Sequence, residues 1–125
     1  MKENDISYDI RGAIFKVYNQ LGPGLLESVY EAALKYELTR MGHKVVSQVG
    51  IPVTYEDQKM DIGFRLDLLV GNKVIIEIKS VETLLPVHHK QLLTYLKLSG
   101  KKLGLLVNFN TDEIEKNIIR IVNNL

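Results

Sequence analysis

The sequence predicts a single α/β domain, and three observations support this. Residues 7–41 carry apolar side chains at helical spacing, residues 44–79 are rich in β-branched residues, and residues 103–109 are a nearly continuous apolar run. Apolar residues three and four apart share one face of a helix, whereas β-branched runs favour strands. The chain of 125 residues fits one compact domain and leaves no room for two.

Two helices are expected first. One is predicted over residues 7–21, ending at Gly22-Pro23-Gly24 because that run breaks a helix. The other is predicted over residues 26–41, with Gly42 as its C-terminal stop. The apolar stripes are Ile10, Ile14, Val17, Tyr18 and Leu21 in the first helix, and Leu26, Val29, Tyr30, Ala33, Leu34, Leu38 and Met41 in the second.

Three strands are expected next. Residues 44–55 alternate between apolar and less apolar side chains, as in a half-buried strand. Pro52 has no N–H to donate, so this strand is expected at a sheet edge or at a bulge. Residues 61–70 and 73–79 are predicted to form a hairpin, with Gly71-Asn72 as its two-residue loop.

The remaining elements complete a mixed sheet. A third helix is predicted from Pro86 to Gly100, because proline is favoured in a first helical turn. Residues 103–109 are predicted as a fully buried strand. A last helix is expected from Thr111, an N-cap residue followed by two acidic residues, with Ile114, Ile118, Ile121, Val122 and Leu125 on its buried face. The order is ααβββαβα, which predicts a mixed four-stranded sheet flanked by helices.

Composition excludes several classes of protein. The chain has no cysteine, which rules out disulfides, zinc ribbons, iron–sulfur clusters and thiol catalysis, and is consistent with the cytoplasmic location that we expect. No stretch approaches the ~20 apolar residues of a membrane span, and residues 1–5 lack the apolar run of a signal peptide. The net charge of +1 differs from that of strongly basic DNA-binding domains. Nucleic-acid contact would therefore need locally clustered Lys and Arg, or metal-bridged phosphates.

Asp67 and Glu77-Ile78-Lys79 flank the predicted hairpin loop. Residues two apart in a strand point to the same face, so Glu77 and Lys79 are expected side by side. Two carboxylates suit Mg²⁺ or Mn²⁺, and a nearby lysine can orient or deprotonate a water or neutralise developing charge. We interpret this as the layout of a metal-dependent phosphodiesterase. The alternative is a solvent-facing Asp67 with a surface ion pair between Glu77 and Lys79, which would contribute little stability.

Two helices carry further candidate residues. Glu27 and Tyr30 are three apart and share a helix face, so Glu27 reaches the metal site, directly or through a water, if that face meets the sheet. Otherwise Glu27 interacts favourably with the helix dipole, and Tyr30 orients Glu27 or packs in the core. Gln91 and Tyr95 share a face with His88 one turn earlier, and they would bind a phosphate or position a lysine. The alternative for these three is a partly buried polar stripe.

Other polar residues are weaker candidates. Lys90, Lys97 and Lys101-Lys102 are the best candidates for phosphate contacts, although a solvated helix face is the preferred interpretation. His43 and His89 are expected at the surface.

These residues together give the chain a resemblance to a known group of enzymes. With Asp67 and Glu77-x-Lys79 on adjacent strands, the αβββαβ order resembles the PD-(D/E)xK nuclease superfamily, which has the restriction-endonuclease-like fold. Residues 24–30 read G-x-x-E-x-x-Y and resemble the small bacterial and archaeal GxxExxY family. Residues 91–95 are similar to the Q-x-x-x-Y element of RecB-like and Cas4-like nucleases. Leu66 stands where the superfamily's name has proline.

The resemblance covers almost the whole chain and implies a nuclease core. It implies that Asp67, Glu77 and the Ile78 carbonyl hold Mg²⁺ or Mn²⁺, assisted by Glu27, and that Lys79 acts with the two carboxylates in catalysis. The substrate would be nucleic acid, DNA rather than RNA. The residues expected on the substrate side are Gln91, Tyr95, His88 and Tyr30.

Two alternatives stay open. One is a nuclease-like fold that binds nucleic acid or a protein partner without cutting. The other is a resolvase-like dimer that acts on branched DNA. Nothing in the chain forms an obvious DNA-recognition arm, so a partner protein or a second copy in a homodimer would supply one.

Overall fold

The computed structural model describes residues 1–125, with the exception of the Ile62 side chain. Two helices come first, α1 (Glu3–Leu21) and α2 (Glu27–Arg40). Three strands follow, β1 (Val45–Tyr55), β2 (Gln58–Val70) and β3 (Val74–Lys79). The chain then forms α3 (Pro86–Ser99), β4 (Leu103–Asn108), the short 3₁₀ helix η1 (Ile114–Asn117) and β5 (Ile118–Val122).

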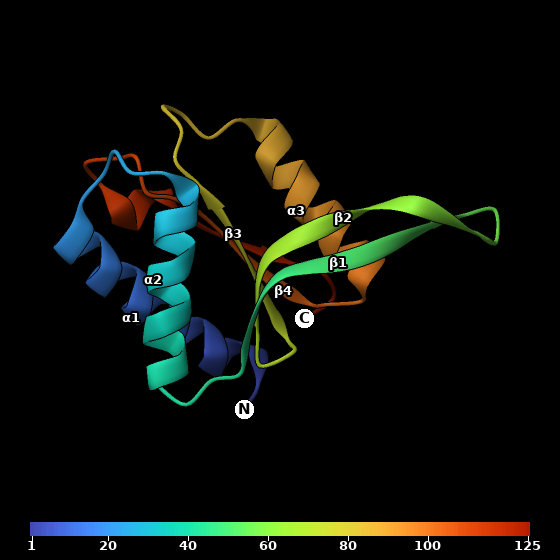
Figure 1. Ribbon diagram of the computed structural model, residues 1–125, viewed down its shortest axis with the longest axis horizontal. Helices are drawn as coiled ribbons and strands as arrows, with labels where there is room; N and C mark the ends of the chain where they lie inside the picture. Colours follow the sequence, from blue (N-terminus) through green and yellow to red (C-terminus); the bar gives the residue numbers. More distant parts are fainter.

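The strands form one mixed five-stranded sheet in the order β1-β2-β3-β4-β5. Neighbouring strands are antiparallel except for β3 and β4, which are parallel. A parallel pair requires a crossover connection, and α3 supplies it. Figure 1 shows α1 and α2 together on one side of the sheet, with α3 on the other. The predicted α/β class and the first three helices and four strands are confirmed, although α1 begins at Glu3 rather than at residue 7. The predicted two-residue loop Gly71-Asn72 is wrong, because Val70 pairs with Val74 and the loop spans residues 71–73.

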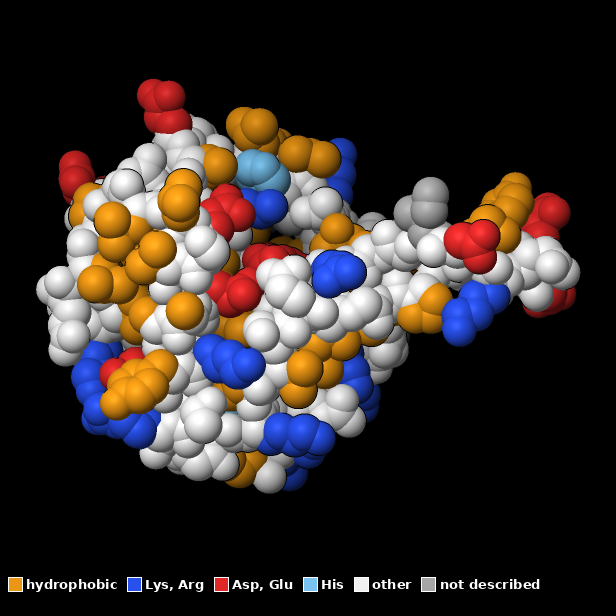
Figure 2. Space-filling view, viewed as in Figure 1, with side chains coloured by type: hydrophobic (Ala, Val, Ile, Leu, Met, Phe, Trp, Pro, Cys, Tyr) orange, Lys and Arg blue, Asp and Glu red, His pale blue; other side chains and the backbone are white. Residues whose placement is uncertain are grey.

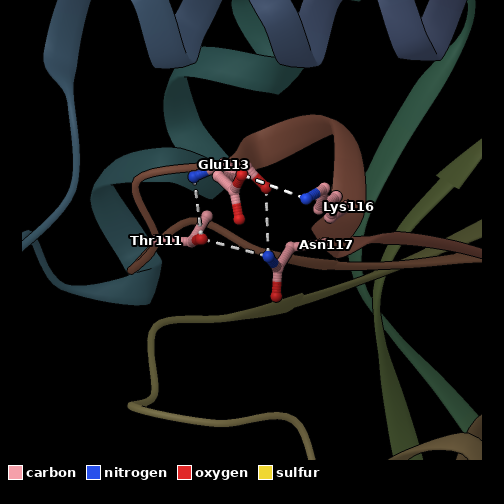
Figure 3. Close-up of polar contacts among 4 residues, drawn as sticks. All are labelled: Thr111, Glu113, Lys116 and Asn117. Atoms are coloured by element: carbon pink, nitrogen blue, oxygen red, sulfur yellow. Dashed lines mark hydrogen bonds and ion pairs between the residues drawn. The ribbon is translucent and has the colours of Figure 1, made fainter.

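The predicted last helix is wrong, and the sheet has five strands instead of four. Thr111 accepts hydrogen bonds from the Glu113 backbone and from Asn117 Nδ2, both at 3.0 Å, so it organises a tight turn with η1 (Figure 3). Residues 118–122 then pair with β4 as an edge strand. Their apolar residues suit a helix face by spacing, but three isoleucines and a valine are β-branched and fit a pleated surface better.

The core lies on both faces of the central strands. Ile76 and Ile78 pack in the cluster beneath α1 and α2, while Ile75 packs with Leu92 and Leu96 of α3. All residues of β3 before Lys79 are buried, as expected of a strand covered on both faces. Residues two apart share a face, so Glu77 points to the same side as Ile75, toward α3.

Strands β1 and β2 continue beyond the body of the protein as a two-stranded arm, seen projecting in Figure 1. Strand β2 pairs with β3 only through residues 68–70, whereas its pairing with β1 runs out to Gln58. The register shifts between Pro52 and Thr54, so the prediction that Pro52 lies at an edge strand or a bulge is confirmed. Gly63 lies opposite Pro52, where a Cβ atom would come within 2.2 Å of the Ile51 carbonyl oxygen.

The close approach of the Ile51 carbonyl oxygen therefore requires glycine at position 63 in the arm. Gly63→Ala should destabilise the protein by about 1–3 kcal/mol, the usual effect of forcing an extra methyl into a filled space. Gly50→Ala is the matched control, because nothing lies within 4 Å of a Cβ atom there. It should change stability by less than about 0.5 kcal/mol. Urea unfolding monitored by circular dichroism measures both variants, and an equal effect of the two would contradict the close contact at Gly63.

Candidate active site

Asp67 and Glu77 come together where β2 and β3 separate. Leu68 and Ile76 are the last paired residues of this ladder, so Asp67 and Glu77 are the next residues outward on the two strands. Asp67 Oδ2 accepts a hydrogen bond from the Ile78 N–H at 2.8 Å. The aspartate side chain thus replaces the backbone acceptor that the departing strand no longer supplies. The structure places these residues on adjacent strands, as predicted.

Glu77 is an unusually buried carboxylate. Its exposed fraction is 5%, and among the described residues no hydrogen-bond partner reaches its Oε1 atom. Burial, together with the hydrogen bond and negative charge of Asp67, raises the pKa of Glu77 to about 9, while the Lys79 ammonium acts in the opposite direction. At neutral pH and without a cation, Glu77 therefore holds a proton. A buried acceptor without a partner is unfavourable by about 1–3 kcal/mol, so this position suits an incoming positive charge.

The donor set suits a hard divalent cation. Within the part of the chain that the structure describes, no three His, Asp or Glu side chains converge tightly enough to enclose a metal alone. Mg²⁺ commonly binds through one or two carboxylates together with waters and substrate phosphates, which Asp67 and Glu77 match. The N–H and C=O of one strand residue face the same neighbour, and the Ile78 N–H faces Asp67. The Ile78 carbonyl therefore faces the gap between the separating strands β2 and β3, and its oxygen fits as a further ligand.

Lys79 ends β3 beside Glu77. Its side chain is half-buried, and no ion pair of Lys79 occurs among the described residues. Its positive charge nevertheless acts on the Glu77 carboxyl group and lowers its pKa. The backbone oxygen of Lys79 accepts a hydrogen bond from the Phe109 N–H at 3.0 Å. The backbone of Lys79 is thereby fixed to the chain that follows β4.

The segment after Lys79 is held from two sides. Asn108, which is 1% exposed, accepts from the Val81 N–H at 3.0 Å and donates to the Val81 carbonyl at 2.9 Å. Ser80 Oγ donates to the Leu25 carbonyl at 2.7 Å, and the Ser80 N–H donates to Glu27 Oε2 at 3.2 Å. Glu27 is therefore brought to the residue that follows Lys79. The sequence gives little indication of Asn108, which is an amide at the end of an apolar strand.

An open recess of about 380 Å³ lies beside this segment, lined by Leu25, Leu26, Glu27, Ser28 and Ser80. Figure 2 shows acidic side chains gathered in a hollow near the centre of the face it draws, with Lys or Arg and His side chains on the rim. A hollow with carboxylates inside and cations at its edge suits a phosphate group held through a metal ion.

Tyr30 supports the site from the core and does not face a substrate. It is fully buried, and its ring stacks on Phe109 with 4.2 Å between the ring centroids. Its hydroxyl donates to the Gly22 carbonyl at 2.6 Å and accepts from the Leu25 N–H at 3.2 Å. The prediction that Tyr30 lies on the substrate side is wrong, whereas its alternative role in the core is observed. Tyr30 holds the loop that positions Glu27.

Helix α3 contributes Tyr95 to the site. Its half-buried ring stacks on Phe64 of β2, with 4.1 Å between centroids and 11° between planes. Burial, followed by the charges of Glu77 and Asp67, raises the pKa of the Tyr95 phenol, which shows that it lies near both carboxylates. Gln91 is exposed one turn earlier on α3. His88 is used differently from the prediction, because its Nδ1 accepts the Leu85 N–H at 3.0 Å and so caps the helix.

The two histidines expected at the surface and the lysines considered for phosphate contacts differ in exposure. His43 is not at the surface, since its side chain is 6% exposed and its Nε2 lies 2.7 Å from Asp9 Oδ2. This contact joins the end of α2 to α1. His89 is half-buried beside a recess that Lys90 also lines. Lys101 donates to Asn72 Oδ1 at 3.2 Å, whereas Lys90, Lys97 and Lys102 are exposed.

The sequence and this fold are similar to those of one known superfamily. The sequence model of the PD-(D/E)XK nuclease superfamily matches residues 4–121, nearly the whole chain. The chain belongs to the PD-(D/E)XK nuclease superfamily. Searches of curated proteins and of solved structures each found no match. Membership confirms the predicted restriction-endonuclease-like fold class, while the narrower likeness to GxxExxY proteins stays a prediction.

Membership also indicates nuclease activity as the class of function, with nucleic acid as the class of substrate. Enzymes of this superfamily generally use divalent metal ions, which agrees with the donor set of Asp67 and Glu77. Among the described residues, no helix is both long enough and apolar enough to cross a membrane.

The raised pKa of Glu77 predicts a pH dependence of stability. Between the ordinary glutamate pKa of 4.5 and about 9, the folded protein binds a proton at Glu77 that the unfolded chain has released. The free energy of unfolding should therefore fall as pH rises across this range when EDTA removes divalent ions. Glu77→Gln keeps the shape without the titration, so its stability should fall less steeply with pH.

Urea unfolding at several pH values between about 5 and 9 measures this difference. Glu115→Gln is the matched control, because Glu115 is exposed and lies on η1. Its pH dependence should match that of the wild type. Parallel pH profiles for the wild type and Glu77→Gln would show that burial does not retain a proton at Glu77.

Proposed function

We propose that this protein is a metal-dependent nuclease that hydrolyses phosphodiester bonds of nucleic acid, DNA in preference to RNA. The observation that carries the proposal is the buried Glu77 Oε1 atom, which lacks a protein partner and lies beside Asp67 and Lys79. A purely structural glutamate at this place would be stabilised by a partner. Superfamily membership supports the same chemistry.

Each residue of the site has a proposed role. Asp67, Glu77 and the Ile78 carbonyl would hold Mg²⁺ or Mn²⁺, with Glu27 assisting directly or through a water. Such an ion would supply Lewis-acid polarisation of the phosphate and lower the pKa of a water. The Lys79 ammonium would position or deprotonate the attacking water, or stabilise the negative charge that develops on the phosphate. The hydrogen bond from Ile78 holds the Asp67 carboxylate in place for this task.

The substrate side of the site is proposed to include α3. Tyr95 lies near the carboxylates and Gln91 is exposed one turn away, so both would contact a phosphate of the bound strand. Lys90, Lys97 and Lys102 are exposed and would add weaker contacts to neighbouring phosphates. His88 is not included, because its Nδ1 accepts the Leu85 N–H and caps the helix.

Cleavage assays test this proposal. Labelled single-stranded, double-stranded and branched DNA, and RNA, are incubated with the protein in Mn²⁺, Mg²⁺ or EDTA. Metal-dependent cutting is expected, and Lys79→Ala and Glu77→Ala should each reduce it by at least about a hundredfold, because each removes a group that acts in the transition state. Lys116→Ala is the control, since its ammonium makes only an exposed ion pair with Glu113.

The outcomes separate the alternatives. Cutting that persists in Lys79→Ala or Glu77→Ala would contradict the assigned roles. Absence of cutting with no Mn²⁺-induced thermal shift would favour a non-catalytic module that binds nucleic acid or a protein partner. Cutting confined to branched DNA, by a species that elutes as a homodimer in size exclusion, would favour the resolvase-like alternative.

A further inference from the structure

Arg65 is a cation beside the site that has no role in the proposed function. It lies on β2 two residues before Asp67, which places the two positions about 7 Å apart along the strand. Its neighbours Phe64 and Leu66 both pack in the cluster against α3, so Arg65 points to the opposite face of the strand, the face toward α2. Arg65 is exposed, and it makes no ion pair among the residues that the structure describes.

The neighbouring strand leaves Arg65 open to solvent. Gly50 lies directly opposite it on β1, and nothing lies within 4 Å of the position that a Cβ atom would take there. In an antiparallel pair, directly opposite side chains share a face and interact with each other. Because glycine has no side chain, the Arg65 guanidinium group meets none at this position, and its N–H donors are available to a ligand.

Lys35 supplies a second cation on the same face. It lies on α2, is exposed and donates a hydrogen bond to Ser47 Oγ on β1 at 3.4 Å. Ser47 pairs with Leu68, which packs in the cluster beneath α1 and α2, so this contact lies on the α2 side of the sheet. Ser47 and Gly50 are three residues apart, about 10 Å along the strand. Lys35 and Arg65 therefore lie near each other at the base of the arm.

The charges around these two residues favour a polyanion that passes the site. Negative charge at the carboxylates of the site repels a phosphate backbone, so phosphates next to one held through a metal ion need positive charge from the protein. Figure 2 shows a Lys or Arg side chain between the acidic hollow and the base of the arm, with others farther along the same face. The tip of the arm is acidic instead, since residues 56–61 hold three carboxylates and one lysine.

We propose that Arg65 and Lys35 bind neighbouring backbone phosphates of the nucleic-acid strand, on the side of the scissile phosphate away from α3. Arg65 holds the phosphate nearest the site, because its distance from Asp67 along β2 is close to the separation of adjacent phosphates in one strand. A guanidinium group suits this place, since its fork of N–H donors matches two phosphate oxygens. Lys35 acts as a point charge on the next phosphate. The inference rests on nucleic acid as the proposed substrate and adds a binding surface for it.

Fluorescence anisotropy of labelled DNA tests the inference without cutting. A short duplex and a single strand of the same sequence are titrated with protein in EDTA, at several salt concentrations. Arg65→Gln and Lys35→Gln should each weaken binding. Each should also reduce the slope of log K against log salt by about 0.9 for the duplex or about 0.7 for the single strand, the change expected for one lost phosphate contact. Arg65→Lys keeps the charge and should retain most of the slope.

Lys59→Gln is the matched control, because it removes the same charge from the same hairpin. Lys59 is exposed and pairs with Thr54 far out on the arm, away from Asp67. Its slope should equal that of the wild type. Equal reductions in Lys59→Gln and Arg65→Gln would show that only net charge matters and would overturn the inference. Circular dichroism checks that each variant is folded.

Binding and cutting together separate this inference from the proposed function. A salt dependence that either substitution leaves unchanged would overturn the role of that residue and leave the nuclease proposal intact. Reduced slopes in a protein that cuts no nucleic acid in Mn²⁺ or Mg²⁺ would support the binding surface and contradict the nuclease proposal. A wild-type protein that binds neither form of DNA would overturn the inference, and cleavage alone would then decide the nuclease proposal.

Discussion

Glu77 lies in the central strand of the sheet, with buried isoleucines on both sides of it in the sequence. An ionised carboxylate in such a place is strongly unfavourable unless charge or hydrogen bonds compensate it. The Lys79 ammonium compensates this cost only in part, and the negative charge of Asp67 adds to it, so the pKa of Glu77 rises to about 9 and the group takes up a proton. The Glu77 carboxyl group is therefore protonated at neutral pH in the absence of a cation. A divalent cation bound as proposed would favour the ionised form, so metal binding would be coupled to proton release at Glu77.

The separation of β2 from β3 makes room for this chemistry. A continuous ladder would have covered the ends of both strands with backbone hydrogen bonds. Asp67 instead satisfies the Ile78 N–H with its side chain, so the sheet ends without an unpaired donor and a carboxylate stays at the opening. The same divergence carries β2 away with β1 into the arm.

Buried and hydrogen-bonded residues surround the gap between β2 and β3. The Tyr30 hydroxyl ties down the loop before α2, while Asn108 pairs with Val81 and thereby fixes the segment after Lys79. The stacked rings of Phe64 and Tyr95 join the base of the arm to α3. Charged groups held by buried, hydrogen-bonded neighbours need little rearrangement when a substrate binds, which is the arrangement that electrostatic catalysis requires.

Local patterns in the sequence were sufficient for most of the fold and for the centre of the site. Helical spacing and β-branched runs located three helices and four strands, because those periods arise from the geometry of each element alone. Asp67, Glu77 and Lys79 could be found because a short hairpin places residues on either side of its loop together. The last segment was misassigned because its isoleucines satisfy a helical spacing, and only the open edge of β4 selects the strand.

Tertiary structure alone decided the contacts between distant residues. Three hydrogen-bonded contacts join residues 17 or more apart in the chain: Glu31 with Gln48, Asn108 with Val81, and His43 with Asp9. No local period encodes such contacts, because they depend on how the strands twist and where the helices pack. The sequence by itself thus determined the elements and the central carboxylates, while packing decided that Tyr30 lies in the core and that Asn108 fixes the segment after Lys79.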